Sequence, residues 1–283
     1  MVEAIEDLFV PVLVYNNKSS DTALLKKFNE RSWNNPIVRF LNADGRDVIK
    51  RASGVWKTAP MAGRMVAALK AAGREVPSYL SGLAIDQAKL QSATFAMSCY
   101  WTGEARLGSI DGVMSTTSGW AGGLEVVQLS YDPKLVDYAT LVSTAQSFQC
   151  ASKVFAHTDA QLQTAKKLVG SRAVKYPGGA TKAKLSDQKY QLRTSKGYRS
   201  LPLTKHQSTK VNSLVRSPQR SELVKLLSPR QKALLGKIAE EMKSGNGAAI
   251  DQLVFPEDDA KLASYQAKLL SRLASNRAGS DSK

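Results

Sequence analysis

The chain has 283 residues, of which 43% are hydrophobic and 23% charged, values close to the averages of folded globular proteins. This length suggests one large or two small domains, and the composition excludes wholesale disorder and a collagen-like or fibrous chain. No apolar stretch has the length of about eighteen residues that a membrane span needs, and acidic residues occupy the N-terminal segment where a secretory signal carries basic ones. We therefore expect no membrane span and a cytoplasmic location, or an exported one if a leader has been trimmed.

The net charge of +16 is concentrated in one part of the chain. Residues 164–243 hold 19 Lys or Arg and four Asp or Glu, an excess of 15 positive charges. Such a stretch attracts polyanions such as nucleic acid, acidic lipid or an acidic protein face, although the solvated surface of an ordinary fold can have the same composition. Tyr176, Tyr190 and Tyr198 interleave with the basic residues, as in base-stacking surfaces, but no RNA-binding signature accompanies them.

The N-terminal part of the chain predicts alternating strands and helices. An apolar, β-branched run predicts a strand at residues 9–15, and a helix over 21–30, strands over 35–43 and 46–51 and a helix from residue 58 to Gly73 follow. In this order residues 1–76 resemble a thioredoxin-like domain, an α/β fold. The place after the first strand where a redox Cys-x-x-Cys pair would stand reads YNNK at residues 15–18. The resemblance therefore implies a scaffold or docking role without dithiol chemistry.

The middle of the chain predicts a second domain. Residues 77–90, with Pro77 and Gly82, read as a linker or a short connecting helix. Residues 91–175 then predict a compact α+β unit with strands over 93–97, 113–119, 125–131 and 152–156. Its helices are expected over 99–108 and 137–145, and from a capping box at Thr158 and Gln161 to Gly170.

The C-terminal part is predicted to be basic and helical. Residues 176–227 are rich in Ser and Thr and lack long periodicity, which indicates a loop-rich segment. Residues 228–275 predict two helices, one opened by Ser228, Pro229 and a capping Gln231, the other beginning at Pro256 with an acidic first turn. Residues 276–283 are expected to form a disordered tail.

Cys99 and Cys150 are the only cysteines, too few for a disulfide scaffold and not spaced as a zinc site. Cys99 stands where the predicted strand over residues 93–97 runs into a predicted helix. The unpaired amides and the dipole at a helix N-terminus favour thiolate over thiol, so Cys99 is a candidate nucleophile. A lone cysteine is, however, also commonly a small buried hydrophobe.

Three ordered motifs around Cys99 resemble those of the A-type peptide methionine sulfoxide reductases. Residues 98–104 read SCYWTGE against the family's GCFWGxE, and residues 111–123 read DGVMSTTSGWAGG against PGVxSTxxGYxGG. Residues 125–133 read EVVQLSYDP against ExVxxxYDP. The resemblance covers about residues 93–170 and implies the family's α+β sandwich for this domain.

The resemblance implies a site and a reaction. Cys99 would attack the sulfoxide sulfur and become a sulfenic acid, Glu125 would protonate the sulfoxide oxygen, and Tyr100 and Trp101 would form an apolar pocket for the substrate methyl group. It implies oxidised methionine, free or in protein, as the substrate and an external thiol reductant such as thioredoxin, with no cofactor and no metal. By themselves, Glu125 reads equally as a strand-end carboxylate, and the two aromatic residues as core.

The sequence also departs from the family. The long loop that normally precedes the glutamate is reduced to Leu124, and the family's GNDxGTQYRS stretch is shortened to residues 145–152. Cys150 there occupies the position of an active-site tyrosine, so the resemblance implies that it lies near Cys99. Cys150 could resolve the sulfenic acid as a disulfide, but a thiol pair that binds a soft metal ion or is inert remains an open alternative. His157 matches a family histidine and is expected to be structural, whereas His206 has no predicted partner.

Two classes of function follow from these observations. The first is thiol-dependent reduction of a methionine sulfoxide, the S-epimer or a related sulfoxide, through Cys99. The second is a catalytically inactive binding module whose basic region, residues 164–243, contacts a polyanion, or a thiol redox sensor built on Cys99 and Cys150.

Overall fold

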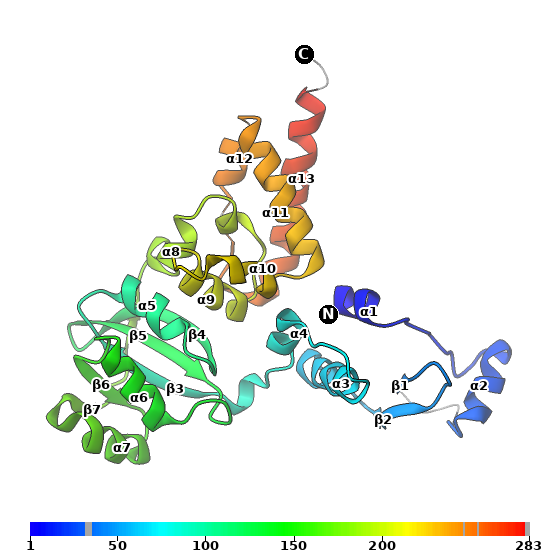
Figure 1. Cartoon of the computed structure of the whole chain (residues 1–283), viewed down its shortest axis with the longest axis horizontal. Coiled ribbons are helices and arrows are strands. Elements are labelled where there is room, and N and C mark those ends of the chain that lie inside the picture. The colour runs from blue at the N-terminus through cyan, green and yellow to red at the C-terminus, as the bar shows by residue number, and fades with distance from the viewer. Residues whose placement is uncertain (32–35, 246, 254, 281–283) are drawn as a thin grey trace. The chain divides into compact units, whose positions relative to one another are not determined.

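The computed structural model describes residues 1–31, 36–245, 247–253 and 255–280. The chain divides into two compact units, Met1–Gln87 and Ala88–Lys283, both of which contain helices and strands (Figure 1). The mixed α/β class expected from the sequence is therefore confirmed. The helices found within the described ranges are all too short or too polar to cross a membrane.

The first unit consists of short helices and one β-hairpin. Its helices are α1 (Val2–Leu8), α2 (Thr22–Lys27), α3 (Thr58–Ala71) and α4 (Ser78–Leu83), and β1 (Ile37–Leu41) pairs with β2 (Asp47–Ser53) in antiparallel fashion. Residues of α3 form the centre of a small core that includes Leu80 of α4. The segment read as a linker or short connecting helix therefore contains a helix that packs into the first unit.

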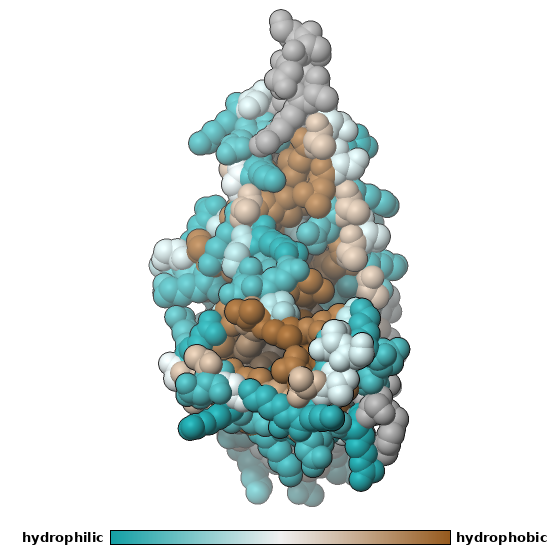
Figure 2. Space-filling view, turned by 90° about the vertical axis from the view of Figure 1, so that its right-hand side faces the viewer, coloured by the Kyte–Doolittle hydropathy of each residue, from teal (hydrophilic) through white to brown (hydrophobic). Residues whose placement is uncertain are grey.

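The strand predicted at residues 9–15 is wrong. This segment pairs with no strand of the described chain, and Val10, Val12 and Leu13 are 90%, 74% and 73% exposed. Figure 2 shows hydrophobic side chains gathered at the surface on the face turned to the viewer. β-Branched residues favour an extended backbone, but a strand also needs a partner edge. Because the first strand does not form and the sheet has two strands, the thioredoxin-like arrangement is not confirmed.

The second unit is built on a six-stranded sheet with the order β7-β6-β3-β5-β4-β8. All neighbouring strands are antiparallel except β6 and β7. The strands predicted over residues 93–97, 113–119, 125–131 and 152–156 are confirmed as β3, β4, β5 and β6. The six strands are β3 (Gln91–Ala96), β4 (Val113–Ala121), β5 (Leu124–Tyr131), β6 (Lys153–Ala156), β7 (Ala173–Lys175) and β8 (Thr181–Lys182).

Three helices cover one face of this sheet. They are α5 (Tyr100–Gly108), α6 (Tyr138–Ser147) and α7 (Asp159–Val169), and they share one apolar core with alternate residues of β3 and β5, such as Phe95 and Val127. The opposite face carries a smaller cluster of Ala96, Val126 and Phe155, packed against residues 174–180. The alternation of buried side chains along β3 and β5 places helices on one side and a chain segment on the other, as in an α+β sandwich. We call residues 91–175 the sheet half of this unit.

The deletion before Glu125 gives a tight β-hairpin. Gly122 and Gly123 both have positive φ angles, +55° and +76°, and join the paired residues Ala121 and Leu124. Two central residues with positive φ form the turn that suits the twist of a hairpin, and glycine adopts it without steric cost. β4 therefore runs directly into β5 where the family has a long loop.

Residues 176–227 differ from the loop-rich segment that we predicted. They hold α8 (Tyr190–Arg193), α9 (Lys205–Leu214) and α10 (Leu223–Leu226), and α9 begins at a capping box formed by Thr204 and Gln207. Leucines of this segment share a second apolar core with the helices that follow, α11 (Pro229–Lys243), α12 (Gly247–Asp251) and α13 (Leu262–Ser280). We call residues 185–273 the helical half. The short helices were not predicted because hydrophobic periodicity can be recognised only over longer stretches of sequence.

The predicted features of the last two helices are only partly confirmed. Ser228 and Gln231 form the expected capping box of α11. The helix predicted from Pro256 begins instead at Leu262, after a 3-10 turn at Asp259–Lys261, and α12 was not predicted. Helix α13 extends to Ser280, so residues 276–280 are helical where we predicted a disordered tail, and the rest of that tail lies outside the described residues.

Candidate functional site

Cys99 is the N-cap residue of α5, at the point where β3 ends. Its backbone is extended, with φ −150° and ψ 110°, and its side chain is partly exposed. The hydroxyl of Thr102, in the first turn, donates to the Cys99 sulfur over 3.7 Å. This position is at the positive end of the helix dipole. The predicted strand–cysteine–helix arrangement is therefore present.

Glu125 lies at the same helix end. Its Oε2 accepts a hydrogen bond from the Tyr100 amide at 2.8 Å, and its carbonyl oxygen accepts one from the Met97 amide at 3.1 Å. The structure thus holds the carboxyl group on the first amide of α5, directly after Cys99. A carboxylate at a helix N-terminus is favourable, and here it also lies beside the candidate nucleophile.

Cys150 lies in the turn between α6 and β6. β3 and β6 pair Thr94 with Phe155 and Ala96 with Lys153, and an extension of this register beyond the strand ends by three residues would pair Cys150 with Cys99. The two segments are still in contact at the start of this extension, because the Ser152 amide donates to the Ala96 oxygen at 3.0 Å, and Cys99 acts electrostatically on the Cys150 thiol. Both cysteines are free thiols in this structure.

The surroundings of Cys150 keep it protonated. It is 3% exposed, and its thiol donates to the Phe148 oxygen over 3.3 Å. Burial raises the pKa of the Cys150 thiol, while the neighbouring Arg106 acts in the opposite direction. Arg106 also donates to the Phe148 oxygen, at 2.6 Å. Of the two thiols, Cys99 is the partly exposed one at a helix N-terminus and Cys150 the buried one.

The aromatic residues next to Cys99 form a continuous cluster. The ring of Tyr100 meets those of Trp101 and Trp120 edge to face, with centroids 6.2 and 5.8 Å apart. Tyr100 is 8% exposed, and burial followed by the charges of Asp187 and Glu125 raises its pKa. Trp101 stacks on Tyr190 with centroids 4.0 Å apart and planes 11° from parallel. The sequence indicated Tyr100 and Trp101, but it gave no reason to connect them with Tyr190.

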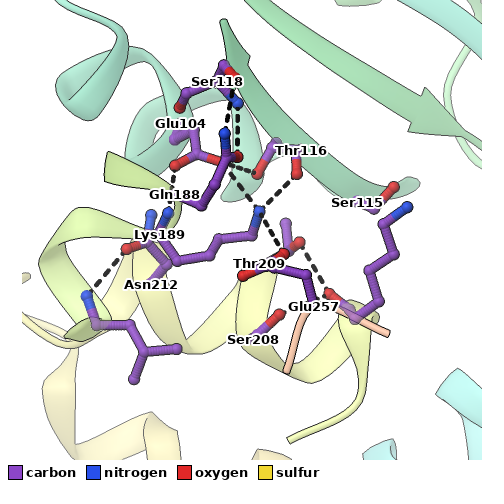
Figure 3. Close-up of polar contacts among 12 residues, drawn as sticks. Glu104, Ser115, Thr116, Ser118, Gln188, Lys189, Ser208, Thr209, Asn212 and Glu257 are labelled. Carbon is purple, nitrogen blue, oxygen red and sulfur yellow. Dashed lines mark hydrogen bonds and ion pairs between the residues drawn. The ribbon is translucent and has the colours of Figure 1, made fainter. Parts of the chain in front are cut away.

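A buried polar cluster fixes α5 to the helical half (Figure 3). Glu104 of α5 and Lys189 are both fully buried and form an ion pair of 2.9 Å, and the Lys189 amide donates to the second carboxylate oxygen at 2.6 Å. Thr116 of β4 donates to Glu104 at 3.1 Å and accepts from Lys189 Nζ through its carbonyl at 2.5 Å. Gln188 binds both backbone groups of Ser118, at 3.0 and 2.8 Å.

Sequence reasoning missed Lys189 because nothing distinguishes it from the other lysines of the basic stretch. The useful signal was its partner, since Glu104 ends the first family motif and lies in a predicted helix. A buried carboxylate needs a cation or hydrogen-bond donors, and here Lys189 supplies both. Lys189 is also one of three non-glycine residues of the described chain with positive φ, at 52°.

The two histidines take structural places. His157 bonds Thr94 at 2.8 Å and stacks on Tyr176 with centroids 4.4 Å apart, as expected for a structural residue. His206 bonds the Met114 carbonyl at 3.3 Å, and burial, followed by the charge of Lys210, lowers its pKa to about 4. Within the part of the chain that the structure describes, no group of three His, Cys, Asp or Glu side chains is arranged to hold a metal ion.

A cavity of about 510 Å³ is lined by residues next to Cys150, among them Arg106 of α5, Phe148 and Gln149, and by Ser213 and Leu214 of α9. Neither Cys99 nor Glu125 lines it.

No family model matches the chain. The peptide methionine sulfoxide reductase A5 of Arabidopsis thaliana is 35% identical over 79 residues, which are 23% of this chain and 31% of the relative. The A5 enzyme of Oryza sativa subsp. japonica is 25% identical over 214 residues, which are 70% of this chain and 77% of the relative. The chain thus spans about a third of the first relative and about three quarters of the second.

Among solved structures, the methionine sulfoxide reductase A of Corynebacterium diphtheriae matches with 18% identity and a TM-score of 0.33, over 42% of this chain and 82% of that protein. The sequence relatives and the three ordered motifs around Cys99 agree. The chain contains a region similar to the peptide methionine sulfoxide reductases of the A type.

Proposed function

We propose that this protein reduces methionine sulfoxide with thiol groups, and that Cys99 is the nucleophile. The observation that carries the proposal is the meeting of Cys99, the N-cap of α5, with Glu125 of β5, whose carboxyl accepts from the Tyr100 amide of α5 at 2.8 Å. A cysteine sulfur as nucleophile and a carboxyl group as proton donor are what displacement at a sulfoxide sulfur requires. The names of the sequence relatives support the same activity.

In the first proposed step, the Cys99 sulfur bonds to the sulfoxide sulfur and Glu125 delivers a proton to the sulfoxide oxygen. Transfer of that oxygen to Cys99 releases the thioether and leaves a cysteine sulfenic acid. The sulfoxide gains two electrons and the Cys99 sulfur loses two, so the step balances without a cofactor. Protonation matters because an oxygen that carries a proton leaves sulfur far more easily than one that carries a charge.

In the second proposed step, Cys150 resolves the sulfenic acid. The Cys150 sulfur bonds to the Cys99 sulfur, one water molecule leaves, and a disulfide remains. The continued register of β3 and β6 supports this pairing. An external dithiol of the thioredoxin type then reduces the disulfide by thiol exchange. The raised pKa of the Cys150 thiol favours its protonated, less nucleophilic form, which fits a group that reacts only after the sulfenic acid has formed.

The test is reduction of a chromophore-tagged methionine S-sulfoxide driven by dithiothreitol, with the intact protein mass recorded after one turnover without reductant. We expect turnover from the unchanged protein, none from Cys99→Ser, and a loss of about two daltons when the disulfide forms. Cys150→Ser is the matched control: it should keep turnover, because dithiothreitol can reduce a sulfenic acid directly, and should gain one oxygen instead. A folded protein without turnover would overturn the proposal.

Polyanion binding is a second candidate function, and one observation favours it. Most Lys and Arg side chains of residues 164–243 are exposed, although Lys189, Arg193 and Lys210 are used inside the protein. Retention on heparin or nucleic acid that falls steeply with salt, in a protein that does not reduce sulfoxides, would support this candidate. Disulfide formation with peroxide, again without sulfoxide turnover, would instead favour the redox sensor.

A further inference from the structure

Tyr190 covers one face of a residue of the candidate pocket. Its ring lies parallel to the indole of Trp101, with centroids 4.0 Å apart. At that distance the two rings are in van der Waals contact, so no third group fits between them. Trp101 is the second residue of the helix whose N-cap is Cys99. The face of the indole that Tyr190 covers is therefore closed to any ligand of Cys99.

Tyr190 is also the last member of a row of aromatic rings. Trp120 of β4, Tyr100, Trp101 and Tyr190 touch in that order. The row passes beside the N-terminus of α5, where Cys99 and Glu125 lie. The first three members belong to the sheet half, and Tyr190 comes from the helical half.

The position of Tyr190 is fixed from both sides along the chain. Gln188 binds both backbone groups of Ser118, and the fully buried Lys189 binds Glu104 and Thr116. After Tyr190, the Leu192 amide donates to Asn212 of α9 at 3.0 Å. The segments on both sides of Tyr190 are therefore held by buried hydrogen bonds, which keeps the residue next to Trp101. A fixed wall of this kind selects ligands by size.

We propose that Tyr190 is a specificity-determining residue of the Cys99 site. Its ring sets the width of the apolar pocket and restricts the group on sulfur that enters it to a small one, such as the methyl group of methionine sulfoxide, against a larger one such as ethyl or phenyl. The proposal rests on the proposed function for its substrate class. Its structural content is independent of turnover: loss of the ring uncovers Trp101 and widens the approach to Cys99.

The first experiment measures that approach without turnover. Cys99 is alkylated with iodoacetamide, which is small, and with N-phenylmaleimide, which carries an aryl ring, and the modified peptide is quantified by mass spectrometry. For Tyr190→Ala we expect the ratio of the maleimide rate to the iodoacetamide rate to rise about tenfold, as when a pocket wall is removed. Tyr190→Phe keeps the ring and should keep the ratio of the unchanged protein.

Tyr176→Ala is the matched control. Tyr176 also stacks on another ring, that of His157, but it has no contact with Trp101. Its removal should leave the ratio unchanged. If Tyr190→Ala does not fold, Tyr190→Leu takes its place, with the same expected direction. An unchanged ratio in a folded variant would overturn the role of Tyr190.

The second measurement compares the reduction of ethionine sulfoxide, which carries ethyl in place of methyl on sulfur, with that of methionine sulfoxide. We expect Tyr190→Ala to raise the relative kcat/KM for the ethyl substrate by about tenfold. A changed alkylation ratio without any turnover would keep Tyr190 as the wall of the thiol site and would reject sulfoxide reduction. Turnover with both ratios unchanged would keep sulfoxide reduction and would reject the wall.

Discussion

The two halves of the second unit make different contributions at helix α5. The sheet half supplies the groups at the N-terminus of this helix, Cys99 and Glu125, which are partly exposed. The helical half holds the rest of the helix: Lys189 binds Glu104, and Lys210 donates to the carbonyl groups of Gly108 and Ile110 at 2.9 and 2.8 Å. Reactive groups need access, whereas the groups that fix them need burial. The sheet half therefore keeps its reactive groups in contact with water, whereas the helical half keeps the charge of Lys189 away from water.

The largest expected effect concerns the buried ion pair. Lys189→Met leaves the Glu104 carboxylate buried without its cation, so the free energy of unfolding should fall by about 3 to 5 kcal/mol. The double variant Glu104→Gln with Lys189→Met removes both charges and should recover most of this loss. Urea denaturation of the three proteins measures both effects.

The control for this prediction is Lys175→Met. Lys175 pairs with Asp159 at 3.3 Å on the surface, where both side chains are more than 70% exposed. Exposed pairs contribute little, so the midpoint of unfolding should stay where it is. If Lys189→Met behaved in the same way, the helical half would not depend on this anchor.

The next effect concerns the reactive end of α5. Glu125→Gln keeps the shape and a hydrogen-bond acceptor for the Tyr100 amide but removes the acid, so kcat for sulfoxide reduction should fall about 100-fold. Asp159→Asn, which changes another carboxylate in the first turn of a helix, should leave kcat unchanged. Similar rates for Glu125→Gln and the unchanged protein would exclude Glu125 as the proton donor.

Two glycines distinguish the packing of the halves. A Cβ on Gly103 of α5 would collide with Met97 and come within 3.2 Å of Val127, whereas nothing lies within 4 Å of one on Gly236 of α11. Gly103→Ala should lower the free energy of unfolding by about 1 to 3 kcal/mol. Gly236→Ala should raise it by about 0.5 to 1 kcal/mol, because alanine favours the helix. Thermal unfolding of both variants checks the opposite signs.

The smallest effect is a dependence of stability on pH. His206 has its pKa lowered to about 4 by burial, so below the ordinary value of about 6.5 the unfolded chain takes up a proton that the folded protein refuses. Its contribution to stability is complete above pH 6.5 and is lost as the pH falls toward 4. Between pH 7 and pH 5, the free energy of unfolding of His206→Gln should therefore fall by about 1 kcal/mol less than that of the unchanged protein. Equal losses of stability in the two proteins would show that groups other than His206 govern the decrease at low pH.

Much of the sheet half could be predicted from local pattern. β3, β4 and β5 lie close to their predicted positions because alternating apolar residues mark strands that bury one face, and the glycine pair at the turn marks the hairpin. The same reasoning failed for residues 9–15, where the propensity is strong but no partner strand is present. It failed again in the helical half, where α8 and α10 have four residues each and owe their form to the core around them.

The sequence by itself determined the strand–cysteine–helix motif at Cys99, the family motifs and the capping box at Ser228, since each depends on residues within a few positions of one another. Only the tertiary structure decided that Lys189 neutralises Glu104 across 85 positions, that Tyr190 covers Trp101, and that the β3–β6 register continues toward Cys150. These contacts form where the fold excludes water, which otherwise hydrates charged groups and surrounds aromatic rings in the same way at every position of the chain. A lysine or tyrosine of the basic stretch acquires its role only when the chain excludes water from it.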